Sequence, residues 1–466
     1  MLRRIYDSPW TWFALSAALL LAAASTLVDL RLEQRPTEGA GEIAALPARD
    51  DLSVLFVLVD TLRADRLGAY GYARPTSPTL DRLAATGIRF ANVESQSSWT
   101  KSSMASLWTG LVPTRSGVTR FDHAIPETAK LPAEIFAEAG FRTAGIWRNG
   151  WVAPNFGFGQ GFETYVRPVA TNLPGRFERR APSLTPIFGT DEDATRAAVS
   201  FLESYGRERF FLYVHYMDVH QYAYDQRAAD LGFGSSYSDG YDSAIHWVDR
   251  NVAALLRGLR DLGLAERTLI VIASDHGEAF MEHGSEGHAR NLYREVTHVP
   301  LILALPFELE RELVVESQVR NVDVWPTVLE LVGLPPLPES DGRSLLPLIE
   351  AAASGSPAPS WPAAVGYLDQ RWGRPEEPPS PLVSVREGGH SLLLARRQRD
   401  VIHAFDLAAD PGERKDLAAE SPAWAPPLLS LAEGSLAATT VFGEAPSVEV
   451  DRLMREQLRA LGYVDH

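Results

Sequence analysis

Short apolar runs alternate with helical periodicity along most of the chain. The first run, residues 54–59, is wholly apolar and is followed by Asp60, a pattern typical of a buried central strand in a parallel sheet. Similar runs follow at 143–146, 210–214, 269–273 and 301–305, and helical patterns separate them at 79–86, 131–139, 191–204 and 243–262. This alternation predicts an α/β fold, in which a large doubly wound sheet lies between two layers of helices.

The pattern changes after residue 350. A Pro- and Ala-rich stretch is followed by three short runs that predict antiparallel strands, at 382–385, 391–395 and 401–405, and by a final helical pattern at 448–461. We therefore expect five parts: a membrane or signal segment (1–28), a linker (29–50), a catalytic domain (51–350), a second linker (351–364) and a small C-terminal α+β subdomain (365–466).

The N-terminal segment carries nineteen consecutive uncharged residues, 10–28, preceded by Arg3 and Arg4. That length is sufficient to span a bilayer. The flanking charges favour a transmembrane anchor with its N-terminus inside and the rest of the chain exported, to the periplasm or the cell exterior. A cleaved signal peptide is the alternative, because three consecutive alanines at 22–24 could serve as a cleavage site.

Composition excludes several classes of function. The 466 residues carry a net charge of −16 and no long basic run, which argues against nucleic acid as a partner. The chain has no cysteine, so disulfides, thiolate metal ligands and a cysteine nucleophile are all excluded.

Polar residues follow the predicted strands at the edge where ligands bind in such sheets. Asp60 follows the first strand, and Asp275 with His276 follows the strand at 269–273. Seven of the eleven histidines lie between residues 215 and 298. Carboxylate and imidazole together suit a divalent metal such as Ca, Mn or Zn, so this edge predicts a metal site.

The stretch 98–110 predicts a helix that begins near Thr100. Serine and threonine residues suit its N-cap, and apolar residues at helical spacing give it a buried face: Met104, Leu107 and Leu111. A helix start favours an anionic group beside it. A divalent metal can also lower the pKa of a bound hydroxyl and make it a nucleophile. The simpler alternative is an ordinary capped helix.

Several segments resemble, in matching order, the motifs of sulfatase-like members of the alkaline phosphatase superfamily (the sulfatase N-terminal domain family). The resemblance covers roughly residues 52–464, and its motifs are 59–65 with 68–71, 274–278 with 282–284 and 287–288, 323–327, 341–345, and 405–407 with 410–413.

The resemblance implies an α/β sandwich of the alkaline phosphatase type that holds one divalent metal ion. It implies that three side chains and the nucleophile oxygen bind this metal: Asp60, Asp275, His276 and Thr100. It also implies that His220 contacts the ester group and that His288 is a cationic or proton-donating group. The predicted substrate-binding residues are Lys101, Arg148, Asn149 and His283. A second metal held by some of these groups, together with Asp218, is the alternative to direct substrate binding.

Departures from the family pattern shift the expected substrate. Sulfatases of this family use an aldehyde made from Cys or Ser, whereas oxidation of the Thr100 side chain would give a ketone. Ser102 and Met104 stand at the Pro and Arg positions of the maturation motif, and Thr61 stands where many relatives carry a second Asp. We therefore expect a metal-dependent hydrolase that cleaves a phosphate monoester or diester through Thr100.

Three alternatives remain open from the sequence: a sulfatase, a membrane-anchored phospho-head-group transferase, and an inactive relative that binds an anionic glycan. In each case the expected partner is an anionic ester, either a small molecule or one linked to a glycan or lipid.

Overall fold

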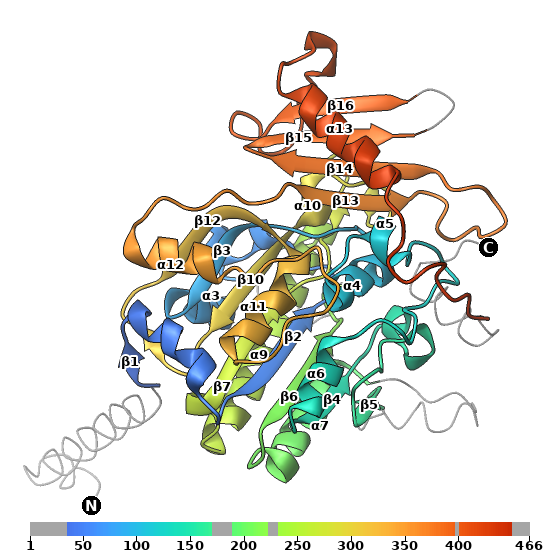
Figure 1. The fold of residues 1–466 in the computed structure, drawn as a ribbon. Coiled ribbons are helices and arrows are strands. Elements are labelled where there is room, and N and C mark those ends of the chain that lie inside the picture. Colours follow the sequence, from blue (N-terminus) through green and yellow to red (C-terminus); the bar gives the residue numbers. More distant parts are fainter. Residues whose placement is uncertain (1–34, 170–188, 222–231, 397–399, 450–466) are drawn as a thin grey trace, which may run out of the picture.

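The computed structural model describes residues 35–169, 189–221, 232–396 and 400–449. Its centre is an eight-stranded sheet (Figure 1). In spatial order the strands are β12 (Leu313–Arg320), β3 (Ile88–Glu94), β10 (His298–Ala304), β7 (Thr268–Ala273), β2 (Ser53–Val59), β6 (Phe210–Tyr216), β4 (Arg142–Ile146) and β5 (Thr164–Val166). All five strands predicted for the large domain are present, and β3, β5 and β12 are additional.

The sheet is mixed, which corrects the expectation that the run at 301–305 is another parallel strand. β10 pairs antiparallel with both β7 and β3, whereas β2 pairs parallel with β6 and β7. The segment between β7 and β10 contains only the short strands β8 (Ala279–Phe280) and β9 (Glu286–Gly287) and the one-turn helix α10 (Arg294–Thr297). A parallel return needs a longer crossover helix, so the chain returns in the opposite direction.

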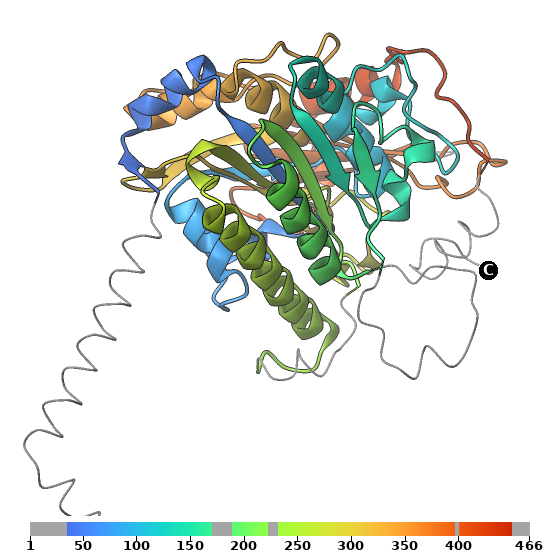
Figure 2. The ribbon, with the colours of Figure 1, turned by 90° about the horizontal axis from the view of Figure 1, so that it is seen from below.

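Helices cover both faces of the sheet, as the sequence predicted (Figure 2). Alternate residues of β2 belong to two separate apolar cores, because successive strand side chains point to opposite faces: Phe56 lies in one core and Val57 in the other. One face carries α3 (Pro78–Ala85), α7 (Asp191–Tyr205) and α9 (Tyr237–Asp261), and the other carries α4 (Thr100–Thr109), α6 (Pro132–Glu138) and α11 (Val324–Leu331). Two further helices are α5 (Pro113–Ser116) and α12 (Leu346–Ser354).

A four-stranded antiparallel sheet forms the C-terminal part of the fold (Figure 1). Its strands are β13 (Ala364–Asp369), β14 (Pro381–Glu387), β15 (His390–Ala395) and β16 (Val401–Asp406), and α13 (Ala425–Leu436) packs on it. The three strands predicted here are present, and β13 is additional. The predicted final helix at 448–461 lies almost wholly outside the described residues.

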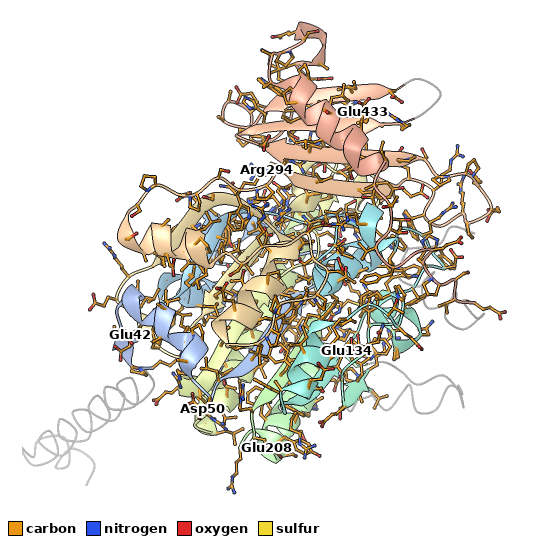
Figure 3. All side chains as sticks on the ribbon, viewed as in Figure 1. Glu42, Asp50, Glu134, Glu208, Arg294 and Glu433 are labelled. Atoms are coloured by element: carbon orange, nitrogen blue, oxygen red, sulfur yellow. The ribbon has the colours of Figure 1, made fainter. Side chains whose placement is uncertain are left out.

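Charged side chains line the outside of the molecule, and Glu42, Asp50, Glu208 and Glu433 are exposed (Figure 3). A short parallel pair, β1 (Thr37–Glu38) with β11 (Glu308–Leu309), lies apart from the main sheet. Within the described residues, none of the helices combines the length and apolar character that a bilayer crossing requires. The predicted anchor at 10–28 lies outside those residues.

Candidate metal-dependent active site

The order of the strands brings the predicted metal ligands together. β2 lies between β7 and β6 in parallel register, with Leu58 opposite Ala273 and Val59 opposite Tyr216. Asp60 follows directly, and its N–H continues the ladder by donating to the Tyr216 carbonyl at 2.9 Å. Because parallel strands end at one edge, Asp60 and the residues after β7 meet there.

Three side chains converge at this edge: Asp60, Asp275 and His276. Their donor atoms lie within 4.8 Å of one another, and all three residues are buried. Among the described residues, Oδ1 of Asp60 and Oδ2 of Asp275 have no hydrogen-bond partner. A buried carboxylate oxygen is normally paired, so these two oxygens fit a bound cation. Two carboxylates and one imidazole suit Ca, Mn or Zn.

The side chains of this cluster do not neutralise its negative charge among themselves. Burial and the neighbouring charge of Asp60 raise the pKa of Asp275 well above its ordinary value. Burial also opposes ionisation of Asp60, but the hydrogen bond from His215 and the nearby His220 lower the pKa of Asp60. Burial lowers the pKa of His276 to about 3. The imidazole of His276 is therefore neutral, which is the form that binds metals.

Thr100 is the first residue of α4 and faces His276. Its Oγ1 lies 3.1 Å from Nε2 of His276. Nδ1 of His276 lies 3.0 Å from the Gly277 carbonyl, which can only accept, so Nδ1 carries the proton and Nε2 presents its lone pair. Ser103 anchors the same helix turn by donating to the Asp275 carbonyl at 2.6 Å. The nucleophile predicted from the sequence is thus held against the donor cluster.

The start of α4 differs from the expected capped helix in one detail. Trp99 is the N-cap, and its own side chain makes no capping hydrogen bond. Ser98 is unavailable because its hydroxyl donates to the Asn291 carbonyl at 2.6 Å. The first N–H groups of the helix therefore receive no cap from the side chain of Trp99.

His220 and His288 stand next to the cluster. The ring of His288 lies 4.5 Å from that of His276 and 4.9 Å from that of His220, measured between centroids. Nδ1 of His288 is 3.1 Å from the carboxylate of Glu278. Burial lowers the pKa of both His220 and His288 to about 4. His288 thus lies against the metal-donor His276, and His220 lies against His288.

The adjacent residues Arg148 and Asn149 have different environments. Asn149 Nδ2 donates to Asp60 Oδ2 at 2.7 Å and lies 3.4 Å from Thr100 Oγ1, so the structure brings it into the cluster. The Arg148 guanidinium instead pairs with two carboxylates, those of Asp191 and Asp218. Asp218 is therefore engaged outside the cluster, and the described residues offer a single converging set of metal donors rather than two.

Comparison with known proteins identifies the family. The family described as "Sulfatase" matches residues 53–334, which is more than half of the chain. A second family, described as "N-sulphoglucosamine sulphohydrolase, C-terminal", matches residues 282–425. The protein belongs to the sulfatase family. This is the family that the resemblance in the sequence implied.

Curated relatives include N-acetylgalactosamine-6-sulfatase of Homo sapiens, 27% identical over 354 residues, with 64% of this chain and 65% of that protein covered. The chain thus spans slightly less than two thirds of that relative. Another relative is delta 4,5-hexuronate-2-O-sulfatase of Bacteroides thetaiotaomicron, 23% identical over 435 residues, with 80% and 86% covered.

Solved structures share the fold. Phosphonate monoester hydrolase of Agrobacterium radiobacter superposes with a TM-score of 0.65 at 18% identity, covering 83% of this chain and 95% of that one. A protein solved in complex with its substrate D-glucosamine-2-N,6-O-disulfate gives a TM-score of 0.64 at 20% identity, covering 83% and 97%. The alkaline-phosphatase-like sulfatase fold, with its small C-terminal antiparallel sheet, is the architecture described above.

Lys101 follows Thr100 in this sulfatase-family chain but does not join the cluster. Its amino group donates to the carbonyls of Phe121 and His123. Nζ also lies over the rings of Phe156, at 3.4 Å from the centroid, and Trp151, at 4.6 Å. Burial lowers the pKa of Lys101 well below its ordinary value. The side chain thus ties helix α4 to the loop at 121–123.

His283 is likewise placed apart from the cluster. Its Nδ1 lies 2.7 Å from Glu295 Oε1, its Nε2 lies 2.9 Å from the Glu413 carbonyl, and its ring stacks on Tyr293. Both ring nitrogens are therefore engaged within the protein. This histidine links the segment after β8 to the C-terminal part of the chain.

Two residues next to the cluster were not among the predicted site residues. His215 in β6 accepts from the Tyr213 hydroxyl at 2.8 Å and donates from Nε2 to Asp60 Oδ2 at 3.1 Å. Glu278 holds His288, as described above. The sequence did carry a signal for both: His215 lies at the carboxyl end of an apolar run, and Glu278 comes two residues after His276.

Proposed function

We propose that this sulfatase-family protein hydrolyses a sulfuric ester carried by a sugar or another organic alcohol, with one divalent cation bound by Asp60, Asp275 and His276. One observation carries the proposal: two unpartnered, buried carboxylate oxygens lie beside a neutral imidazole and a hydroxyl at a helix start. The names of the curated relatives, which act on N-acetylgalactosamine and hexuronate sulfates, make a sulfated glycan unit the first substrate class to test.

The proposed reaction uses Thr100 as nucleophile. The cation, when bound, lowers the pKa of a neighbouring hydroxyl and withdraws charge from the ester oxygens. His276 and Asn149 fix the hydroxyl of Thr100, and the first N–H groups of α4 favour the anionic ester group. As Oγ1 attacks, its proton passes to a neutral imidazole, that of His288 or His220, and the imidazolium gives this proton to the leaving alcohol while the ester to Thr100 forms. Water then cleaves the ester and restores the hydroxyl.

A second candidate is hydrolysis of a phosphoric monoester or diester. The observation that favours it is Thr100 itself, in a chain with no cysteine, because a plain hydroxyl can form and release a phosphoryl group without an aldehyde. Both candidates use the same residues in the same roles, so only the substrate distinguishes them.

The experiment that tests these candidates compares three substrates on the full chain with Mn²⁺ or Ca²⁺ present: 4-nitrophenyl sulfate, 4-nitrophenyl phosphate and bis(4-nitrophenyl) phosphate. The proposal expects the largest kcat/KM for the sulfate. A phosphate substrate that is hydrolysed at least about tenfold more efficiently would replace the first candidate by the second. No turnover of any of the three would refute both.

Thr100→Ala is expected to lower kcat by about a thousandfold or more, because the nucleophile is lost, with metal content unchanged. Ser102→Ala is the matched control: this neighbouring buried hydroxyl on α4 has no hydrogen-bond partner in the described part of the chain, and its removal should leave kcat unchanged. Mass spectrometry of the quenched wild-type reaction should find the transferred group on Thr100. Retention of activity by Thr100→Ala would remove Thr100 from the mechanism.

The membrane-anchored, exported location remains part of the proposal, on the basis of residues 3–28. Expression of the full chain and of a chain starting at residue 35, followed by membrane fractionation, tests it. An anchored hydrolase should lose membrane association, but not turnover, when the segment is removed. Group transfer to an added acceptor alcohol in place of water would favour the transferase alternative.

A further inference from the structure

The backbone directly after the first metal ligand is strained. Thr61 has a φ of +60°, in the left-handed region that a β-branched residue rarely adopts. Two contacts tie this strained residue to the donor cluster: its N–H donates to Asp275 Oδ1 at 3.3 Å, and its hydroxyl donates to the Asp60 carbonyl at 2.7 Å. The geometry of the two carboxylates therefore depends on a turn in which Thr61 adopts a conformation that is unfavourable for threonine.

One side chain from a distant helix closes this turn. The hydroxyl of Tyr241, in α9, donates to the Thr61 carbonyl at 2.6 Å and accepts from the Arg63 N–H at 2.9 Å. Tyr241 is fully buried, and burial raises its pKa, so the phenol keeps the proton that it donates. The hydroxyl oxygen of Tyr241 thus makes hydrogen bonds with two peptide groups of the strained turn, the Thr61 carbonyl and the Arg63 N–H.

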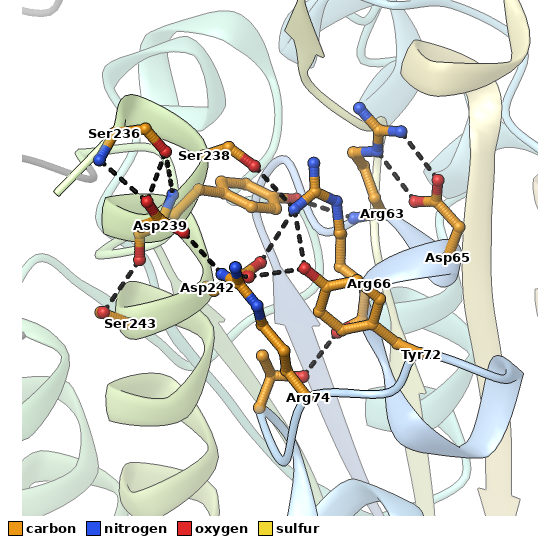
Figure 4. A network of polar contacts seen from close by, with 12 residues as sticks. Arg63, Asp65, Arg66, Tyr72, Arg74, Ser236, Ser238, Asp239, Asp242 and Ser243 are labelled. Carbon is orange, nitrogen blue, oxygen red and sulfur yellow. Dashed lines mark hydrogen bonds and ion pairs between the residues drawn. The ribbon is translucent and has the colours of Figure 1, made fainter. Parts of the chain in front are cut away.

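The first turns of α9 are themselves fastened to the loop that follows Thr61 (Figure 4). Asp242, next to Tyr241, pairs with Arg66 at 3.0 Å and with Arg74 at 2.8 Å, and it accepts from the Tyr72 hydroxyl at 2.6 Å. Because Asp242 is buried, these pairs are only weakly screened by solvent. They hold the helix turn that carries Tyr241 at a fixed distance from the strained turn.

We propose that Tyr241 is a positioning residue for the metal site: its hydroxyl holds the Thr61 turn, and the turn holds the carboxylates of Asp60 and Asp275 ready for the cation. The inference rests on the metal site of the proposed function. Tyr241 lies 180 residues after Thr61 in the chain, in the helix on the opposite face of the sheet from α4.

The test measures binding of Mn²⁺ alone to the metal-free full chain by calorimetry, so it does not depend on any substrate. Tyr241→Phe is expected to weaken binding about tenfold. Thr61→Gly added to that variant should restore most of the affinity, because glycine adopts positive φ without strain. A merely structural role of Tyr241 would not be rescued at Thr61.

Tyr70→Phe is the matched control. The Tyr70 hydroxyl also bridges a carbonyl and an N–H, in this case both of Leu301, at 3.2 and 3.0 Å, but it touches neither the strained turn nor a metal donor. This variant should lose stability and bind Mn²⁺ with the wild-type affinity.

Wild-type affinity in Tyr241→Phe would overturn the inference while leaving the metal site intact. If Tyr241→Phe does not fold, the double variant with Thr61→Gly decides: a folded, Mn²⁺-binding protein supports the inference, and a second failure to fold overturns it. Absence of Mn²⁺ and Ca²⁺ binding in the wild type would instead refute the metal site of the proposed function.

Discussion

Two groups of buried acids in this protein have opposite environments. At the carboxyl ends of β2 and β7, Asp60 and Asp275 lie side by side; in the part of the chain that the structure describes, neither pairs with an Arg or Lys, and one oxygen of each has no partner. Between the two sheets, Glu94 and Glu413 are as deeply buried, but Arg386 bridges them at 3.2 and 3.0 Å.

The difference separates a binding site from a structural ion-pair cluster. This cluster, formed by Arg386, Glu94 and Glu413, is called the joint below. A buried charge is strongly destabilising unless it is paired. Glu413 meets this requirement within the protein: besides Arg386, it accepts from the Arg294 N–H at 2.7 Å and from Ser391. Asp60 and Asp275 each keep one oxygen without a partner among the described residues, so we expect the remaining positive charge to come from a bound cation. The contrast predicts that removing an acid has opposite consequences in the two places.

The largest effect is expected for Asp275→Asn. This change should lower kcat by about a thousandfold and weaken Mn²⁺ binding at least about a hundredfold, because it removes a charged donor. The metal-free variant should nevertheless be more stable than the metal-free wild type, by about 1 kcal/mol, since an uncompensated buried charge is gone. Calorimetry with Mn²⁺ and urea unfolding in the presence of a chelator measure the two quantities.

Asp249→Asn provides the control for Asp275→Asn. Asp249 is also buried, but its carboxylate accepts the N–H groups of Thr79 and Leu80 at 2.9 to 3.0 Å. Its loss should destabilise the protein and leave Mn²⁺ binding unchanged. A metal-free Asp275→Asn that is markedly less stable than the wild type would contradict the assignment of Asp275 as an unpaired charge.

The reverse result is expected for Glu413→Gln. The change leaves the guanidinium of Arg386 buried with one carboxylate fewer, and breaking such a pair lowers stability by about 3 kcal/mol. Mn²⁺ affinity should stay at the wild-type value. Glu377→Gln, at the solvent-exposed pair with Arg371, should change stability by less than about 0.5 kcal/mol. Equal stabilities of Glu413→Gln and the wild type would mean that the joint is not held by charge pairing.

The metal-donor group of Asp60, Asp275 and His276 could be predicted from the sequence because the pattern that indicates it is local. A wholly apolar run ends in Asp60, another ends just before Asp275 and His276, and parallel strands place such ends together. The antiparallel direction of β10 was missed because it depends on the short connection from β7, which hydrophobic periodicity does not report.

The placements of Lys101 and His283 could not be predicted for a different reason. Both follow motif residues closely, but distant groups fix their side chains. Lys101 turns toward carbonyls of the 121–123 loop and the ring of Phe156. His283 lies between β8 and β9, in a loop with left-handed conformations at Met281 and Gly284, and contacts the Glu413 carbonyl, 130 residues away in the chain. Only tertiary packing decides such contacts.

The smallest expected effect concerns the pH dependence of the joint. Burial alone would lower the pKa of His283, but its hydrogen bond to Glu295 and its contact with the Glu413 carbonyl raise that pKa above the ordinary value. The stabilisation from a raised histidine pKa is complete below the unfolded value, about 6.5, and is lost as the pH rises through the folded value. His283→Gln should therefore remove part of the decline in wild-type stability above about pH 6.5, by less than about 1 kcal/mol because the pair is partly exposed.

Urea unfolding at several pH values between 5.5 and 8.5 measures the decline, and Glu295→Gln should flatten it in the same way. Parallel stability curves for the wild type and His283→Gln would show that this histidine carries no charge in the joint.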